Sequence, residues 1–113
     1  MGRAMDSGCL QMPKIKLRDN EWVVVQDKAS FHKGAIAFSG VLILTSRRLV
    51  WLPDGRIERL AGARPIGVGL ERIGSVAVAG LDKMLHVKVS SRVLRFSGAG
   101  PRRMKDRIDL HRA

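Results

Sequence analysis

The chain has 113 residues, 45% of them apolar, which suits a single domain with its own core and excludes general disorder. Its 21 lysine and arginine residues outnumber 10 acidic residues, and the net charge of +11 favours polyanionic partners: nucleic acid, an anionic membrane face or an acidic protein surface. Cys9 is the only cysteine, so an internal disulfide is excluded and a reducing, cytosolic compartment is indicated. No apolar run approaches the ~20 residues of a membrane span, so we expect any membrane contact to be peripheral, on the inner face.

Residues 1–13 lack the long apolar run of a signal peptide and are predicted to be a disordered leader, with the domain occupying residues 14–113. The first strand is predicted over 21–26, where Trp22 is followed by three consecutive valines, since aromatic and β-branched residues favour strands. The polar segment from Asp27 to Lys33 is interpreted as a connection.

The stretch from Ala35 to Thr45 is predicted to be a long strand. Ile36, Phe38, Leu42 and Leu44 recur at a spacing of two or multiples of it and therefore share one face, whereas the residues between them point to the other. Gly40 interrupts the row and is interpreted as a bulge or sharp bend. Residues 45–47 form a polar break, and the apolar pattern resumes over 48–52, which completes an antiparallel hairpin.

Four further short strands and a helix follow along the chain. A turn at 53–55 and a charged connection from Arg56 to Arg64 lead to the predicted strands 66–70, 73–78, 84–90 and 92–96. Pro101 suits the first turn of a helix, and Met104 and Ile108 lie on one helical face, which must pack on the sheet for so short a helix to be stable. The order of elements predicts about seven antiparallel strands and one C-terminal helix.

The hairpin sequence GVLILTSRRLVW, from Gly40 to Trp51, resembles the signature of GRAM and related pleckstrin-homology-like domains, in which a strand opens with glycine and ends in Leu-Thr, and the next opens with Arg-Leu and an aromatic residue. The segment LERIGSV, from Leu70 to Val76, and the later paired strands resemble the same family. The resemblance covers roughly residues 16–110. It implies a strongly bent β-sandwich or partial barrel capped by the C-terminal helix, and a binding module rather than an enzyme.

The same resemblance implies a ligand site near the first strand connection, where lysine and arginine hold anionic lipid headgroups. The positions here are Lys28, Lys33, Arg47 and Arg48, whose ammonium and guanidinium groups suit phosphate, although they equally fit solvated loop charges. Phe31 either anchors the domain in a membrane interface or, as we favour, tucks under the loop as a plug.

Other chemistries are less well supported by the sequence. The histidines His32, His86 and His111 lack the spacing of metal ligands, and no side chains are placed to form a catalytic group, so no metal, cofactor or catalytic residue is predicted. The Gly-rich run at 66–70 lacks the remaining features of a phosphate-binding loop. A protein-interaction or self-associating scaffold is the alternative to lipid binding, and nucleic-acid binding is third, because four of the five aromatic residues fall in predicted core strands.

Overall fold

The computed structural model describes residues 15–55, 62–80, 83–98 and 100–112, which form a seven-stranded antiparallel sheet and a C-terminal helix. The elements are β1 (Val23–Lys33), β2 (Ile36–Thr45), β3 (Arg48–Pro53), β4 (Ile66–Gly69), the 3-10 turn η2 (Leu70–Arg72), β5 (Ile73–Ala79), β6 (Met84–Val89), β7 (Arg92–Gly98) and α2 (Pro101–Arg112). The predicted fold class, mainly β with one C-terminal helix, is confirmed.

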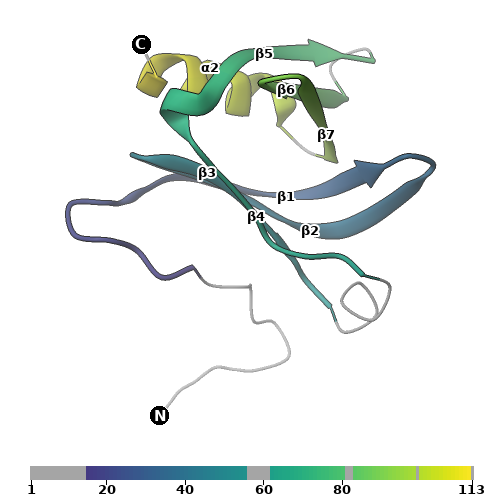
Figure 1. The fold of residues 1–113 in the computed structure, drawn as a ribbon, viewed down its shortest axis with the longest axis horizontal. Helices are drawn as coiled ribbons and strands as arrows, with labels where there is room; N and C mark the ends of the chain where they lie inside the picture. Colours follow the sequence, from purple (N-terminus) through teal and green to yellow (C-terminus); the bar gives the residue numbers. More distant parts are fainter. Residues whose placement is uncertain (1–14, 56–61, 81–82, 99, 113) are drawn as a thin grey trace.

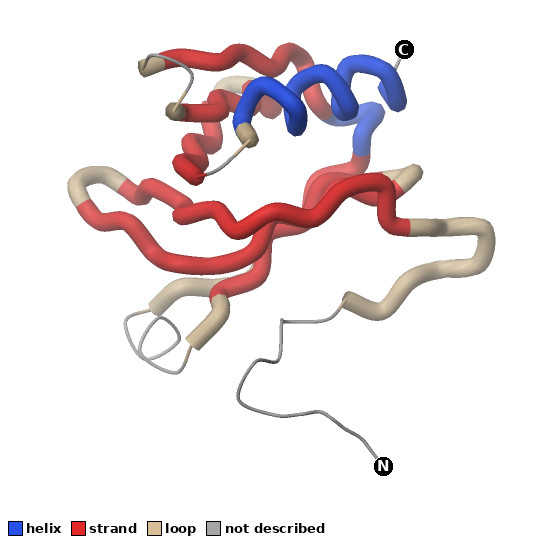
Figure 2. Tube along the Cα trace, turned by 180° about the vertical axis from the view of Figure 1, so that it is seen from behind, coloured by secondary structure: helices blue, strands red, loops and turns tan. Residues whose placement is uncertain are grey.

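The sheet has the strand order β4-β3-β2-β1-β7-β6-β5 and bends so that its two halves lie over one another (Figure 1). The strands β1 to β4 form one layer, and β5 to β7 form the other. Among the described strands, the two halves are hydrogen-bonded to one another through the pairing of β1 residues 29–32 with β7 residues 95–98. The helix α2 packs against β5 and β6 and reaches η2, β1 and β2, so it closes one end of the molecule (Figure 2).

The core lies between the two layers and under α2. It follows the period-two pattern of the strands, because Leu42 and Leu44 of β2 point inward, as do Leu85 and Val87 of β6. The helix contributes Met104, 2% exposed, together with Ile108, which is fully buried, and this confirms the predicted helical face. Val41, Ile43 and Val50 are also buried but stand outside the core cluster, on the opposite face of the sheet.

Gly40 is not a bulge, and its role differs from the one predicted. It pairs with Ala29 and with Pro53 in uninterrupted registers on both sides. The indole of Trp51 lies directly over it: a Cβ built on Gly40 would stand 2.6 Å from the ring carbon Cε2, and the indole nitrogen donates a hydrogen bond of 3.0 Å to the carbonyl oxygen of Ala29. The glycine leaves space for a core ring.

The first strand is longer than predicted. The segment interpreted as a connection from Asp27 to Lys33 continues β1 and pairs with β2 through the whole range. The chain reverses only at Gly34 and Ala35. Phe31 therefore lies on a strand, partly buried, with its ring centroid 5.4 Å from that of Trp51 and 5.6 Å from that of Phe96. Its ring packs inward as the favoured plug interpretation proposes, and a role as membrane anchor stays a prediction.

Some predictions fall on residues that the structure does not describe. The predicted leader and Cys9 lie outside the described residues, as does most of the charged connection between Arg56 and Arg64. Of that connection, Ala63 packs against the core cluster, where it is 9% exposed.

Candidate anion-binding site

The four residues predicted from the sequence to hold an anion do not come together. Lys33 ends β1 at the β1–β2 turn, whereas Arg47 and Arg48 lie at the β2–β3 turn. The ten-residue strand β2 separates these turns by roughly 30 Å, at ~3.3 Å per residue. Lys28 pairs with Val41 on the outer face of the sheet and is exposed. A single headgroup cannot contact all four.

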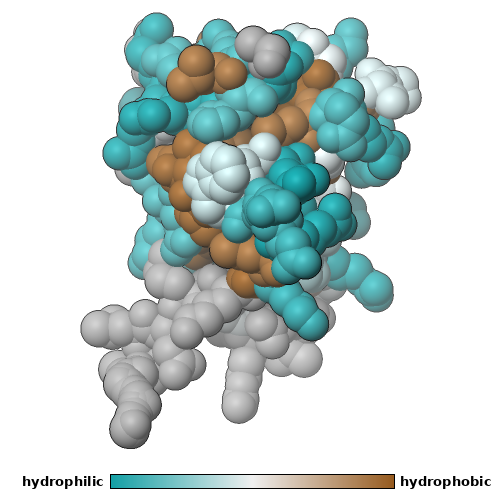
Figure 3. Space-filling model, turned by 90° about the vertical axis from the view of Figure 1, so that its left-hand side faces the viewer, coloured by the Kyte–Doolittle hydropathy of each residue, from teal (hydrophilic) through white to brown (hydrophobic). Residues whose placement is uncertain are grey.

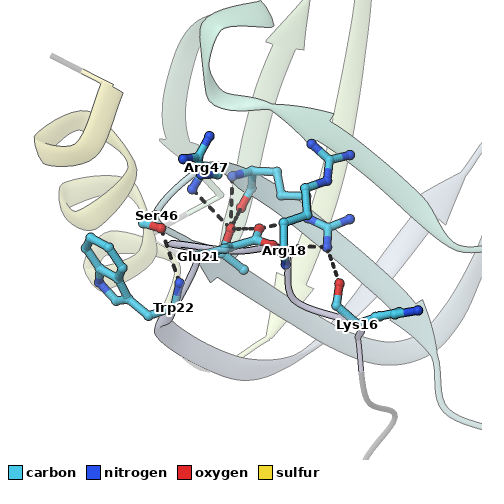
Figure 4. Close-up of polar contacts among 8 residues, drawn as sticks. Lys16, Arg18, Glu21, Trp22, Ser46 and Arg47 are labelled. Atoms are coloured by element: carbon cyan, nitrogen blue, oxygen red, sulfur yellow. Dashed lines mark hydrogen bonds and ion pairs between the residues drawn. The ribbon is translucent and has the colours of Figure 1, made fainter.

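Arg48 belongs to a hydrogen-bonded network around the buried carboxylate of Glu21 (Figure 4). Its guanidinium donates from Nε to Oε2 of Glu21 at 2.9 Å and from an Nη to the carbonyl oxygen of Lys16 at 2.8 Å. The hydroxyl of Thr45 donates to the same carboxylate at 2.6 Å, and the backbone N–H of Arg18 donates to Oε1 at 2.8 Å. The network fastens the segment before β1 to the β2–β3 turn, so Arg48 has a structural role.

The carboxylate of Glu21 is held in its charged form. Hydrogen bonds from Arg48, and then from Thr45, lower the pKa of Glu21 from 4.5 to about 2, against the opposing effect of burial. The Glu21 side chain is fully buried, while that of Arg48 keeps 22% of its surface exposed. One carboxylate thus neutralises Arg48 and leaves the neighbouring arginines unmatched.

Those arginines surround a hollow of 660 Å³ between the β2–β3 turn, β4, η2 and the last turn of α2. We call this surface the basic corner and define it by six side chains: Arg18, Arg47, Arg48, Arg72, His111 and Arg112. Glu71 is the acidic residue among those described that line the hollow. The guanidinium of Arg112 donates hydrogen bonds to the carbonyl oxygens of Ile73 and Gly74.

Three guanidinium groups of the basic corner are available to a ligand. The side chains of Arg18, Arg47 and Arg72 are exposed, and none of them makes a hydrogen bond or ion pair with another residue in the part of the chain that the structure describes. Guanidinium groups present planar sets of donors that match phosphate and carboxylate oxygens. The arrangement is chemically suited to binding an anion.

Exposed apolar side chains flank the basic corner. Trp22 is 58% exposed. Its backbone N–H donates a hydrogen bond to the hydroxyl of Ser46, and its carbonyl oxygen accepts one from the Ser46 N–H; Ser46 in turn lines the hollow. The Trp22 ring points away from the Glu21 carboxylate (Figure 4). Val23, the next residue, is 42% exposed, and Leu17, in the same segment, is 41% exposed. Figure 3 looks onto this end of the molecule, where hydrophobic surface runs between hydrophilic groups.

The sequence identified only part of this surface. Arg47 was identified from the hairpin. Arg18 was not, because residues 1–27 have no net charge and showed no basic cluster, and Arg72 lies in a turn between two short strands. Trp22 was expected in the core and is instead largely exposed. The run Glu21-Trp22-Val23-Val24-Val25 has no polar–apolar alternation that would indicate which residues face inward. The exposure of Trp22 depends on its tertiary hydrogen bonds with Ser46, which the local sequence does not encode.

The described helices include none with the length and apolar character required to cross a bilayer. Among the same residues, no group of three or more histidine, cysteine, aspartate or glutamate side chains is arranged to hold a metal ion.

Neither a family model nor a curated protein matches the sequence, but solved structures match the fold. The C-terminal domain of an unknown protein from Leishmania infantum aligns with a TM-score of 0.69 at 12% identity, over 83% of this chain and 86% of that one. The Vps36 N-terminal PH domain aligns with a TM-score of 0.61 at 15% identity, over 84% of each chain. The DH/PH domains of p115-RhoGEF align with a TM-score of 0.59 at 12% identity, over 83% of this chain and 29% of that one. Assignment to the GRAM subgroup stays a prediction, and the fold itself is pleckstrin-homology-like.

Proposed function

We propose that the chain is a non-catalytic module that binds peripherally to anionic membranes through the basic corner. The observation that carries the proposal is that three guanidinium groups without a partner among the described residues lie around the hollow, and that exposed Trp22 is hydrogen-bonded through its backbone to Ser46, which lines the same hollow. Each basic residue near an anionic bilayer contributes about 1 kcal/mol of attraction. Tryptophan favours the headgroup region because its ring is apolar and its N–H can remain hydrated.

The apolar flank favours a membrane over nucleic acid. Sequence-tolerant nucleic-acid binders stack successive bases on several aromatic rings. Of the aromatic side chains here, Trp22 is the exposed one, since Phe31 is half-buried and Phe38 is 8% exposed. The other exposed apolar side chains of the segment that carries Trp22 are aliphatic and come from Leu17 and Val23. Aliphatic side chains suit a lipid interface.

Exposed basic residues on other surfaces provide a matched control for the proposed site. The variant R18A/R47A/R72A removes three charges from the basic corner, and K28A/K33A/R95A removes three exposed charges from other surfaces. We expect the first to weaken sedimentation with phosphatidylserine-containing vesicles by about 100-fold, from ~1 kcal/mol per charge, and the second by far less. Raised salt should weaken wild-type binding.

Equal losses in the two variants would show attraction by net charge without a site, and a loss confined to K28A/K33A/R95A would place the membrane contact elsewhere. Either result overturns the proposal. Trp22→Ala should weaken binding to the same vesicles even at high salt, since it removes apolar contact and no charge.

A further inference from the structure

The strand β4 stands at one end of the described sheet, where its strand partner is β3. Its second edge, along Ile66–Gly69, has no strand beside it among the described residues. Backbone N–H and C=O groups along such an edge form a template to which another strand can add. Gly67 has no side chain, and a Cβ built on it would meet no atom within 4 Å, so the backbone beside this edge is accessible.

Two adjoining hollows run along this strand and form what we call the β4 groove. One, of 340 Å³, lies between β4 and the β6–β7 hairpin and is lined by Ile66, Val68, Val89 and Leu94. The other, of 250 Å³, continues toward the β1–β2 turn and is lined by Phe31, Phe38 and Ala63. The hollows share Pro65, Ile66 and Arg92, so they are contiguous. The groove has apolar walls beside an unpaired strand edge.

The charge of the β4 groove restricts the partner. Lys33, Arg64, Arg72 and Arg92 line the two hollows, and no acidic residue is among the described residues that do so. None of these four side chains forms an ion pair with another described residue. The positive charges beside β4 oppose pairing with a second copy of the chain, which carries a net charge of +11. The occupant must be acidic.

We propose that the β4 groove binds an extended acidic segment of another protein, which adds to β4 as an eighth strand. Alternate side chains of an added strand point to opposite faces, so apolar residues at every second position can enter the groove. Acidic residues at the two ends of the added segment then meet Arg64, Arg72 and Arg92, which line the groove. Main-chain hydrogen bonds to β4 contribute affinity, and the arginines select for negative charge.

A capped, fluorescein-labelled peptide with valines at alternate positions of its centre and glutamates at both ends is a suitable probe, with binding measured by fluorescence anisotropy. We expect Arg92→Glu to weaken binding by about 10-fold or more, since charge reversal places like charges together. Arg95→Glu is the matched control, because Arg95 is on the same strand but points away from the neighbouring core residues Leu94 and Phe96, and it should change affinity less than ~2-fold.

A second probe separates strand addition from simple charge attraction. The same peptide N-methylated at alternate residues keeps its charges but loses the backbone donors that face β4, and we expect no measurable binding by wild-type protein. Equal binding of the methylated peptide overturns the proposal, as do equal effects of the two arginine reversals. Arg92 lies outside the basic corner, so R92E should retain vesicle binding. If R92E instead loses vesicle binding to the same extent as R18A/R47A/R72A, the groove is a lipid site and this proposal is wrong.

Discussion

Replacing Gly40 with alanine is expected to lower the free energy of unfolding by about 1–3 kcal/mol, because the new Cβ has no space. It would stand 2.6 Å from the Trp51 ring and would also meet the backbone carbonyl oxygen of Leu52, which cannot move without disturbing the β2–β3 ladder. Chemical denaturation followed by circular dichroism measures the change. Gly67→Ala is the control, since no atom lies within 4 Å of the added carbon, and it should change stability by no more than ~0.5 kcal/mol.

The double variant G40A/W51F tests the cause. A smaller ring removes part of the clash, so we expect the two substitutions together to cost less than the sum of each alone. Additive effects, or equal losses in G40A and G67A, would show that contact between Trp51 and residue 40 is not the reason for the glycine.

Replacing Glu21 with glutamine should lower the free energy of unfolding by about 2–3 kcal/mol, somewhat below the ~3–5 kcal/mol of a fully buried pair, since Arg48 is partly hydrated. The amide carries one acceptor oxygen instead of two, so it cannot serve Arg48, Thr45 and the Arg18 N–H together. Glu71→Gln removes an exposed carboxylate nearby and should change stability by no more than ~0.5 kcal/mol.

The effect of Glu21→Gln has a defined pH dependence. The pKa of Glu21 is about 2 in the folded protein, below its usual value of 4.5, so the carboxylate stabilises the fold fully above pH 4.5. That stabilisation is lost as the pH falls from 4.5 toward 2. The stability difference between wild type and E21Q should therefore narrow over this interval, and a constant difference would contradict the role of the charged carboxylate.

Vesicle binding gives a second measurement on the same variant. The segment that Glu21 fastens carries Arg18 and Trp22 to the basic corner. E21Q raises the net charge by one, which by charge alone should strengthen binding to anionic vesicles. We expect weaker binding instead, because the segment loses its anchor.

Sequence reasoning predicted the fold well wherever alternation was strong. The hairpin around residues 45–48, the strands β6 and β7 and the inward face of α2 follow directly from the spacing of apolar residues. It failed where local chemistry resembled a loop. The polar segment from Asp27 to Lys33 continues a strand because β2 and β7 pair with it from both sides, and no local pattern encodes that tertiary pairing.

The site was harder to predict than the fold. The adjacent residues Arg47 and Arg48 look equivalent in the sequence, yet Arg48 is neutralised by a carboxylate 27 positions away and Arg47 is not. The hollow itself collects side chains from the segment before β1, from η2 and from the end of α2. Their proximity depends on the bend of the sheet, which the composition of each segment does not specify.

The strand order also has a consequence for folding kinetics. The strands β1 to β4 form one succession of neighbouring pairs, and β5 to β7 form another, so most pairing is local within each half. The junction of β1 with β7 brings together residues 63 to 69 positions apart, because Ala29 pairs with Gly98 and His32 with Arg95. Closing so long a loop costs entropy before the core contacts offset it. The two halves can therefore form early, and the joining of β1 to β7 is the step expected to limit the rate of folding.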